Sequence, residues 1–184
     1  MRRPPAGFTL VELLAVLAIG AALLALALPD LNALLRAQQL RGATSDLFEA
    51  IGLARAQAIA RNERIRLAPR DPAGADWAQG WTVFADRDED GAAGPGDEII
   101  AVHGPLASGF AFHFGFAGPA PPYYIAYNGA GRSCSDTSSA AARPGTLTLF
   151  HGGAIRRIKI NMLGRARTCN PARDDNCGGA EAPS

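Results

Sequence analysis

Gly7-Phe8-Thr9-Leu10-Val11-Glu12 opens a run of sixteen uncharged residues, Leu13 to Leu28, and this stretch decides how the rest of the chain is interpreted. The run approaches the length of a membrane-spanning helix, and Glu12 is the one charge at its start. A charged side chain in a bilayer costs on the order of 2.5–3.5 kcal/mol or more, so such an acid is usually paired or functional. We therefore expect Glu12 to have a partner. The alternative is an ordinary single-pass anchor whose Glu12 reaches toward the lipid headgroups.

The residues before this stretch form a short basic leader, Met1-Arg2-Arg3-Pro4-Pro5-Ala6-Gly7. A secretory signal peptide has its small-residue cleavage site after the apolar region, whereas here Gly7 precedes it, so the apolar segment would be kept. By the positive-inside rule, Arg2 and Arg3 predict a cytoplasmic leader and an exported remainder.

The N-terminus resembles the class III signal of type IV pilins and type II secretion pseudopilins in its basic leader, its Gly7-Phe8 junction, Glu12 and Pro29. The resemblance implies that a prepilin peptidase cuts after Gly7, that Phe8 becomes the N-methylated terminus, and that Glu12 pairs with the terminal amine of a neighbouring subunit. A carboxylate and an ammonium buried together can neutralise each other, which agrees with this role. The implied partners are other pilin subunits, the prepilin peptidase and the inner membrane.

Apolar spacings of three and four predict one long helix from about Phe8 to Arg61, with a kink or unwound stretch between Gly20 and Pro29. Beyond the helix, the 184-residue chain has room for one globular domain. The predicted organisation is a leader at 1–7, a membrane or filament-core helix half at 8–28, an amphipathic half at 29–62, a β-rich domain at 63–169 and a flexible tail at 170–184 unless Cys177 ties it down.

Short β-type runs separated by Gly and Pro follow the helix. They are Arg64–Ala68, Trp81–Ala85, Glu98–His103, Phe110–Phe114, Tyr123–Tyr127, Thr146–Phe150 and Ile155–Ile160. We therefore predict an α+β, pilin-like fold in which the long N-terminal helix packs against an antiparallel β-sheet domain.

The charge is near balance overall, at +1, but it is unevenly distributed. Residues 71–98 hold eight acids and one base, whereas residues 151–173 hold six bases and no acid. The basic segment contains Gly164-Arg165-Ala166-Arg167, where the glycine predicts a turn or bulge that presents two guanidiniums.

This motif resembles the Gly-Arg-x-Arg signature of FimT-type minor pilins, which are implicated in capturing DNA. The resemblance implies double-stranded DNA contacts at Arg165 and Arg167, with electrostatic support from Arg156, Arg157 and Lys159. The alternative is that these side chains are solvated or pair with the acidic 71–98 region.

Asp86, Asp88, Asp90, Gly91 and Asp97 match the spacing of a calcium loop, although the twelfth position is Asp rather than Glu and the flanks are predicted strands. The alternative is a polar connection between two strands of a hairpin, and Ca²⁺ is the one cofactor that the sequence suggests. The segment Gly80–Phe84 with this acidic turn also resembles FimT/GspH-type domains.

Three cysteines, Cys134, Cys169 and Cys177, lie in the part predicted to be exported, so one disulfide and one free thiol are expected. The sequence favours a bridge that includes Cys169 without choosing its partner. The aromatic residues Trp77, Trp81, Tyr123, Tyr124 and Tyr127 are predicted to pack in the core, with base stacking as the alternative.

No catalytic or metal-ligand spacing involves His103, His113 or His151, so an enzyme is not expected. The sequence predicts a FimT/FimU-like minor type IV pilin, anchored in the inner membrane with a periplasmic domain and then built into a pilus at the cell surface. The alternative is a GspH-like minor pseudopilin of a type II secretion system.

Overall fold

The computed structural model describes residues 9–183 except 89 and 119, and within the helix it does not describe the side chains of residues 22–30. The predicted processing residues Gly7 and Phe8 therefore lie outside the described residues. The chain divides into two compact units, residues 1–36 and residues 37–184.

The helix α1 (Leu10–Arg61) spans 52 residues and ends where the sequence predicts. Its backbone stays helical across Gly20–Pro29, so the predicted unwinding is wrong. Residues 21–28 consist of Ala and Leu alone, which are among the best helix formers, and this preference outweighs the disruption expected from Pro29. Asn62, in the left-handed region at φ 52°, terminates the helix.

The first unit is a helix with an apolar surface. Leu13, Leu14 and Leu17 are each more than half exposed. Thr9 Oγ1 accepts a hydrogen bond of 3.2 Å from the Glu12 backbone N–H, and the side chain of Glu12 is exposed. Among the described residues, no helix has the length and apolar character needed to cross a membrane.

In the second unit, the remaining part of α1 buries one stripe of small and aliphatic side chains against the sheets. The stripe consists of Leu40, Ala43, Leu47, Ile51, Ala54 and Ala58, all no more than 4 % exposed. Their spacing of three and four residues places them on one face of the helix.

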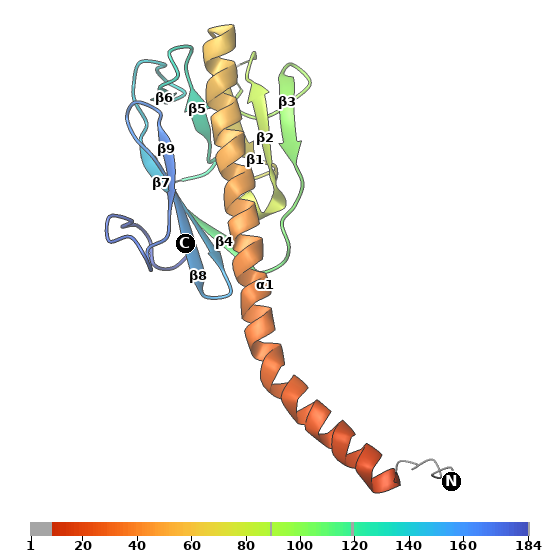
Figure 1. Cartoon of the computed structure of the whole chain (residues 1–184). Coiled ribbons are helices and arrows are strands. Elements are labelled where there is room, and N and C mark those ends of the chain that lie inside the picture. Colours follow the sequence, from red (N-terminus) through yellow and green to blue (C-terminus); the bar gives the residue numbers. More distant parts are fainter. Residues whose placement is uncertain (1–8, 89, 119, 184) are drawn as a thin grey trace, which may run out of the picture. The chain divides into compact units, whose positions relative to one another are not determined.

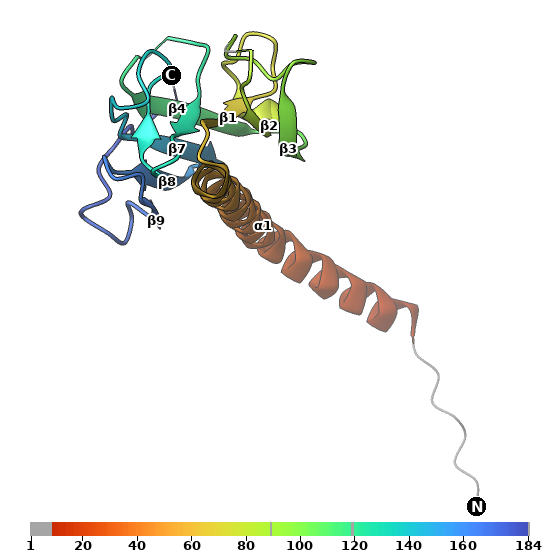
Figure 2. The same cartoon turned by 90° about the horizontal axis from the view of Figure 1, so that it is seen from above.

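This face of the helix packs against two antiparallel sheets, and both sheets lie on the same side of the helix (Figures 1 and 2). The first sheet has the order β3-β2-β1-β5-β6, with bounds β1 Ile65–Pro69, β2 Trp81–Ala85, β3 Glu98–His103, β5 Ile125–Tyr127 and β6 Ser133–Cys134. The second has the order β4-β7-β8-β9, with bounds β4 Phe110–Phe116, β7 Gly145–His151, β8 Ala154–Ile160 and β9 Ala166–Cys169. A short 3-10 helix, η1 (Trp77–Gln79), precedes β2. The predicted fold class is confirmed.

Three of the five aromatic side chains predicted to pack in the core are buried, and Tyr123 and Tyr124 are partly buried. Trp77 and Tyr127 are fully buried and Trp81 is 2 % exposed, so these three have no free face for a base. Tyr124 is partly buried beneath two arginines, with Arg143 Cζ 4.0 Å and Arg66 Cζ 4.5 Å from its ring centroid. This arrangement uses the ring face in cation–π contacts within the domain.

Candidate functional site

The Gly164-Arg165-Ala166-Arg167 motif forms the turn and first residues of the β8–β9 hairpin. Gly164 N–H donates to the Asn161 carbonyl at 2.9 Å, and Asn161 N–H donates to the Arg165 carbonyl at 3.1 Å. The Asn161 side chain completes the turn, because its Oδ1 accepts from the backbone N–H groups of Leu163 at 3.0 Å and Arg165 at 2.9 Å. The predicted turn is therefore present, and the residues after it form a strand that the sequence did not predict.

Gly164 is required by the packing of this turn. Its φ is 76°, and an added Cβ would lie 2.9 Å from Tyr127 Cε1 and 3.0 Å from Ser133 N, with the Gly131 carbonyl closer still. Any side chain would thus be strained twice, by the backbone conformation and by contact with the neighbouring β5–β6 connection. The glycine of the motif has a structural role in this fold.

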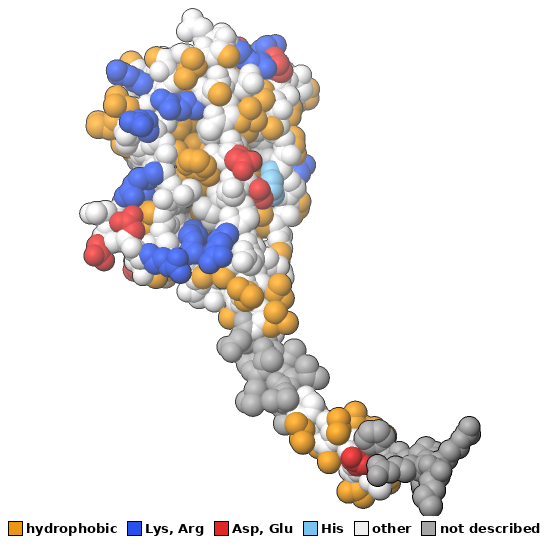
Figure 3. Space-filling view, in the orientation of Figure 1, with side chains coloured by type: hydrophobic (Ala, Val, Ile, Leu, Met, Phe, Trp, Pro, Cys, Tyr) orange, Lys and Arg blue, Asp and Glu red, His pale blue; other side chains and the backbone are white. Residues whose placement is uncertain are grey.

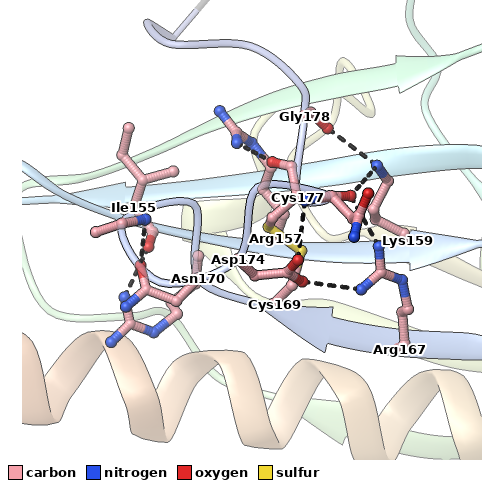
Figure 4. Close-up of a disulfide and its surroundings, with 12 residues drawn as sticks. Ile155, Arg157, Lys159, Arg167, Cys169, Asn170, Asp174, Cys177 and Gly178 are labelled. Carbon is pink, nitrogen blue, oxygen red and sulfur yellow. Dashed lines mark hydrogen bonds and ion pairs between the residues drawn. A yellow bond between two sulfur atoms is a disulfide. The ribbon is translucent and has the colours of Figure 1, made fainter.

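Three of the predicted DNA-contacting residues, Arg157, Lys159 and Arg167, face the C-terminal segment (Figure 4). The register of β8 and β9 pairs Lys159 with Arg167 and Arg157 with Cys169, which places these residues on the outer face of the sheet. The segment that follows β9 folds back over this face and is held there by Cys169–Cys177, whose Cα atoms are 5.8 Å apart. The predicted flexible tail is therefore tied down, as expected if Cys177 formed a bridge.

Arg157 is wrongly predicted as a DNA contact because it is fully buried. Its guanidinium donates to the carbonyl of Cys177, to the carbonyl of Ala180 at 2.6 Å and to Glu181 Oε1 at 2.7 Å. A buried cation needs such partners to offset its lost hydration. Sequence alone does not distinguish Arg157 from the adjacent Arg156, although two adjacent strand residues point to opposite faces of the sheet.

Lys159 and Arg167 also donate hydrogen bonds to the C-terminal segment. Lys159 Nζ donates to the Gly178 carbonyl at 3.1 Å, and Arg167 donates to Asp174 Oδ2 at 3.1 Å and to the Asn176 carbonyl at 2.9 Å. The Arg167 side chain nevertheless remains 50 % exposed. Its acidic partner lies in the disulfide loop and not in the acidic region 71–98 that the sequence suggested as an alternative.

Arg165 keeps its guanidinium free of hydrogen bonds and ion pairs within the described part of the chain, and it is exposed. It lines a surface hollow together with Lys159 and Arg167 on the outer side of the β8–β9 hairpin. These three side chains form the motif hollow, which has no acid among its lining residues.

A second basic hollow borders the end of β9, and the sequence motif did not indicate it. Its charged lining is Arg41 from α1, Arg156 from β8 and Arg173 beyond β9, and hydroxyl and amide groups from Thr44, Ser45, Thr168 and Asn170 complete it. We call it the three-arginine hollow. Partial burial lowers the pKa of Arg156, and the positive charges of Arg41 and Arg173 lower it further. Three cations thus repel one another around a hollow whose lining contains no acid.

The signal for this hollow was partly visible in the sequence. Arg156 and Arg173 belong to the basic segment, whereas Arg41 lies in the long helix, far from both along the chain. Figure 3 shows Lys and Arg side chains gathered beside the helix on the side of β8 and β9. Arg41 and Arg156 are more than a hundred residues apart in the chain, and no local pattern predicts that they line the same hollow.

The predicted calcium-loop residues lie together in the connection between β2 and β3. The carboxylates of Asp86, Asp88, Asp90 and Asp97 offer ligand atoms within 4.8 Å of one another. Asp86 also pairs with Arg66 at 2.8 Å. The connection joins two adjacent antiparallel strands, so the loop is at the same time the polar hairpin connection that was the alternative.

The third cysteine and the histidines take positions within the fold. Cys134 is a buried free thiol, and burial raises its pKa. His151 bonds to the Gly109 carbonyl at 3.0 Å and to Gln39 Oε1 at 2.9 Å, and His103 stacks on Trp81 with ring centroids 4.0 Å apart. These contacts are structural ones.

In this fold, one apolar stripe of a long helix packs on two antiparallel sheets. In the sequence, a short basic leader precedes an apolar run that begins with a single glutamate. Together these features define a pilin-like subunit. Two family models match the chain: "Prokaryotic N-terminal methylation motif" over residues 2–28, and "Type II transport protein GspH" over residues 43–164. The chain belongs to the GspH family of minor pilins and pseudopilins. Members of this family are structural subunits, not enzymes, and membership implies other pilin subunits as partners and processing by a prepilin peptidase.

Solved structures agree with this fold. The type IV minor pilin FimU of Pseudomonas aeruginosa matches with a TM-score of 0.53 and 14 % identity, covering 73 % of this chain and 91 % of that chain. The minor pseudopilin EpsH from the type 2 secretion system of Vibrio cholerae matches with a TM-score of 0.51 and 16 % identity, covering 72 % and 98 %. No curated protein sequence matches the chain.

Proposed function

We propose that this chain is a minor pilin of a type IV pilus and that its basic surface beside β9 binds the phosphate backbone of double-stranded DNA. In this role the chain is anchored in the inner membrane before assembly, its domain lies in the periplasm, and the assembled pilus carries the domain to the cell surface. The observation that carries the DNA proposal is the three-arginine hollow, where clustered cations lie without an acid.

Phosphate binding accounts for features of this hollow that a merely solvated surface would not require. The side chains of Arg41 and Arg173 are exposed and make no hydrogen bond or ion pair within the residues that the structure describes. An anion between them would offset the partial burial and the charge repulsion that together lower the pKa of Arg156. Guanidinium groups bind phosphate oxygens in pairs, and the Thr168 hydroxyl and Asn170 amide groups that line the hollow can donate to the same oxygens. The hydroxyl groups of Thr44 and Ser45 already donate, to the Leu40 carbonyl and to Glu49 Oε1.

The motif hollow extends this surface along β9. Arg165 and Arg167 lie at the start of the strand, whereas Thr168, Cys169 and Asn170 at its end line the three-arginine hollow. A duplex backbone that follows β9 would meet cations at both positions. We therefore assign the phosphate contacts to Arg41, Arg156, Arg165 and Arg173, with half-exposed Arg167 at the rim.

A salt-dependent mobility-shift titration of the full chain in detergent tests the proposal. The variant Arg41→Gln/Arg173→Gln should bind DNA more weakly and flatten the plot of log affinity against log salt by about 0.9 for each lost phosphate contact. Because both side chains are exposed, the substitutions should leave stability within about 0.5 kcal/mol. Arg165→Gln should show the same change at about half the size.

The matched control removes two exposed arginines elsewhere, in Arg70→Gln/Arg132→Gln. Its salt slope should equal that of the wild type. Equal affinity and slope for the wild type and the Arg41/Arg173 variant would withdraw the DNA role. A GspH-like pseudopilin role would be favoured instead if the gene lies among secretion genes and not among pilus-assembly genes.

A further inference from the structure

We propose that the twelve-residue connection Asp86–Asp97, between β2 and β3, binds one calcium ion. This site is separate from the basic surface beside β9, and nothing in the proposed DNA role depends on it. Four carboxylates from this one connection approach within 4.8 Å of one another. The only residue of the connection outside the described part is residue 89, which stands between two of the ligand positions.

The positions of these acids match the ligand order of a calcium loop. Asp86, Asp88, Asp90 and Asp97 occupy its first, third, fifth and twelfth positions, and Gly91 stands at the sixth. Gly91 has a φ of 84°, the left-handed conformation that the sharp turn of such a loop requires. The seventh position, Ala92, would supply its backbone carbonyl.

Asp86 provides the independent sign that a cation is needed. Its side chain is 0 % exposed, and Oδ2 pairs with Arg66 Nη1 at 2.8 Å. The other oxygen, Oδ1, is buried without a hydrogen-bond partner among the described residues. A buried carboxylate oxygen that no donor satisfies is unfavourable, and a bound metal ion would satisfy it.

Arg66 does not neutralise the cluster. Its guanidinium is shared between Asp86 and Asp136, with Nη1 2.9 Å from Asp136 Oδ1. Arg87 is the one basic residue of the connection itself, and it pairs with Glu98 at 2.6 Å. Asp88, Asp90 and Asp97, next to the buried Asp86, form no ion pair of their own with another described residue.

Hydrogen bonds inside the connection orient the other carboxylates. Asp97 accepts from the backbone N–H groups of Arg87 at 2.9 Å and Gly94 at 2.8 Å. Each carboxylate oxygen has a second lone pair, so these bonds are compatible with metal ligation. The exposed Asp88 and Asp90 leave one side open to solvent, where water can complete the coordination.

An all-oxygen set of this size favours calcium over magnesium. Calcium accepts six to eight oxygen ligands in flexible geometry, whereas magnesium prefers a strict octahedron and keeps several of its waters. Asp at the twelfth position is shorter than the usual Glu. We therefore expect a dissociation constant on the order of 10⁻⁴ M, typical of extracellular calcium modules.

The test is a calorimetric titration of the full chain in detergent, after removal of metal with EDTA, with CaCl₂ and separately with MgCl₂. The wild type should bind one Ca²⁺ per chain and unfold at a higher temperature when Ca²⁺ is present, with a smaller effect of Mg²⁺. The variant Asp88→Asn/Asp90→Asn should bind Ca²⁺ at least tenfold more weakly. Its amide oxygens still accept the backbone hydrogen bonds of the turn, which protects the fold.

A control variant, Glu49→Gln/Asp175→Asn, removes two exposed acids outside the connection and should respond to Ca²⁺ as the wild type does. In EDTA the Asp88/Asp90 variant should unfold at or above the wild-type temperature, because like charges have been removed. Absence of saturable Ca²⁺ binding to the wild type overturns the proposal, and so does unchanged binding by the Asp88/Asp90 variant. Equal stabilisation by Mg²⁺ and Ca²⁺ refutes the selectivity for calcium.

Discussion

At the scale of single residues, equal charges in the basic segment have different roles because burial differs. Arg157 is fully buried and holds the C-terminal segment, while Arg165, eight positions later, is exposed and unpaired within the described residues. The sequence presents both as arginines of one basic run. Whether an arginine is available to a polyanion depends on the strand face it occupies and on what covers that face.

Gly164→Ala should destabilise the domain without removing any charge. The left-handed backbone alone makes Ala unfavourable by about 1–2 kcal/mol, and contacts with Tyr127 and Ser133 add to that. Gly153→Ala is the matched control, because its φ is also positive, at 82°, but nothing lies within 4 Å of the added Cβ. Denaturant unfolding should show a larger loss for Gly164→Ala than for Gly153→Ala. Equal losses would mean that the turn can move away from the β5–β6 connection.

The residues that could be predicted from the sequence are those whose role follows from a local pattern. The helix end at Arg61, the turn at Gly164 and the clustering of Asp86 with its loop partners depend on spacing along one short segment. The three-arginine hollow depends on Arg41 and Arg156, far apart in the chain, lining the same surface depression. Periodicity contains no information about which strand will pack beside which turn of a helix.

At the scale of elements, β9 and the segment after it account for most of the differences from prediction. Arg167–Thr168–Cys169 is short, polar and adjacent to a turn, so it lacks the alternating apolar pattern of a typical strand. It pairs with β8 as the edge of the second sheet, and the disulfide loop covers its outer side. This cover removes Arg157 from solvent and leaves the hollows at the two ends of β9 accessible.

The disulfide should be needed to keep this cover in place. Cys169→Ser/Cys177→Ser opens a loop with a sequence separation of eight, for which chain entropy gives a loss of about 2–3 kcal/mol. Hydrogen exchange should rise in residues 170–183, and the segment should become sensitive to limited proteolysis. The control is Cys134→Ala, which removes the buried free thiol and should leave the C-terminal segment protected. Unchanged protection in the double variant would mean that the contacts of Arg157 suffice.

At the scale of the whole molecule, the chain combines an apolar helical unit with a domain that places different charges on different surfaces. Asp46 and Glu49 line a groove with Val102 and His103 on the β3 side of α1, whereas the arginine hollows lie beside β9. Side chains of both signs around one helix suit a subunit that contacts several neighbours at once. The near-neutral total charge keeps such a subunit from binding polyanions non-specifically.

Glu12→Gln should separate processing of the chain from its assembly. The variant should still lose residues 1–7 and carry a methylated Phe8, since the cleavage junction is unchanged, and intact-mass measurement checks this. It should co-purify with other pilin subunits much less than the wild type, because the neutral amide cannot compensate a neighbour's terminal ammonium in an apolar environment. Asp175→Asn, the corresponding change at an exposed acid of the second unit outside the groove on the β3 side of α1, should assemble normally. Normal assembly of Glu12→Gln would show that Glu12 is only an exposed acid near the start of α1, as in a simple membrane anchor.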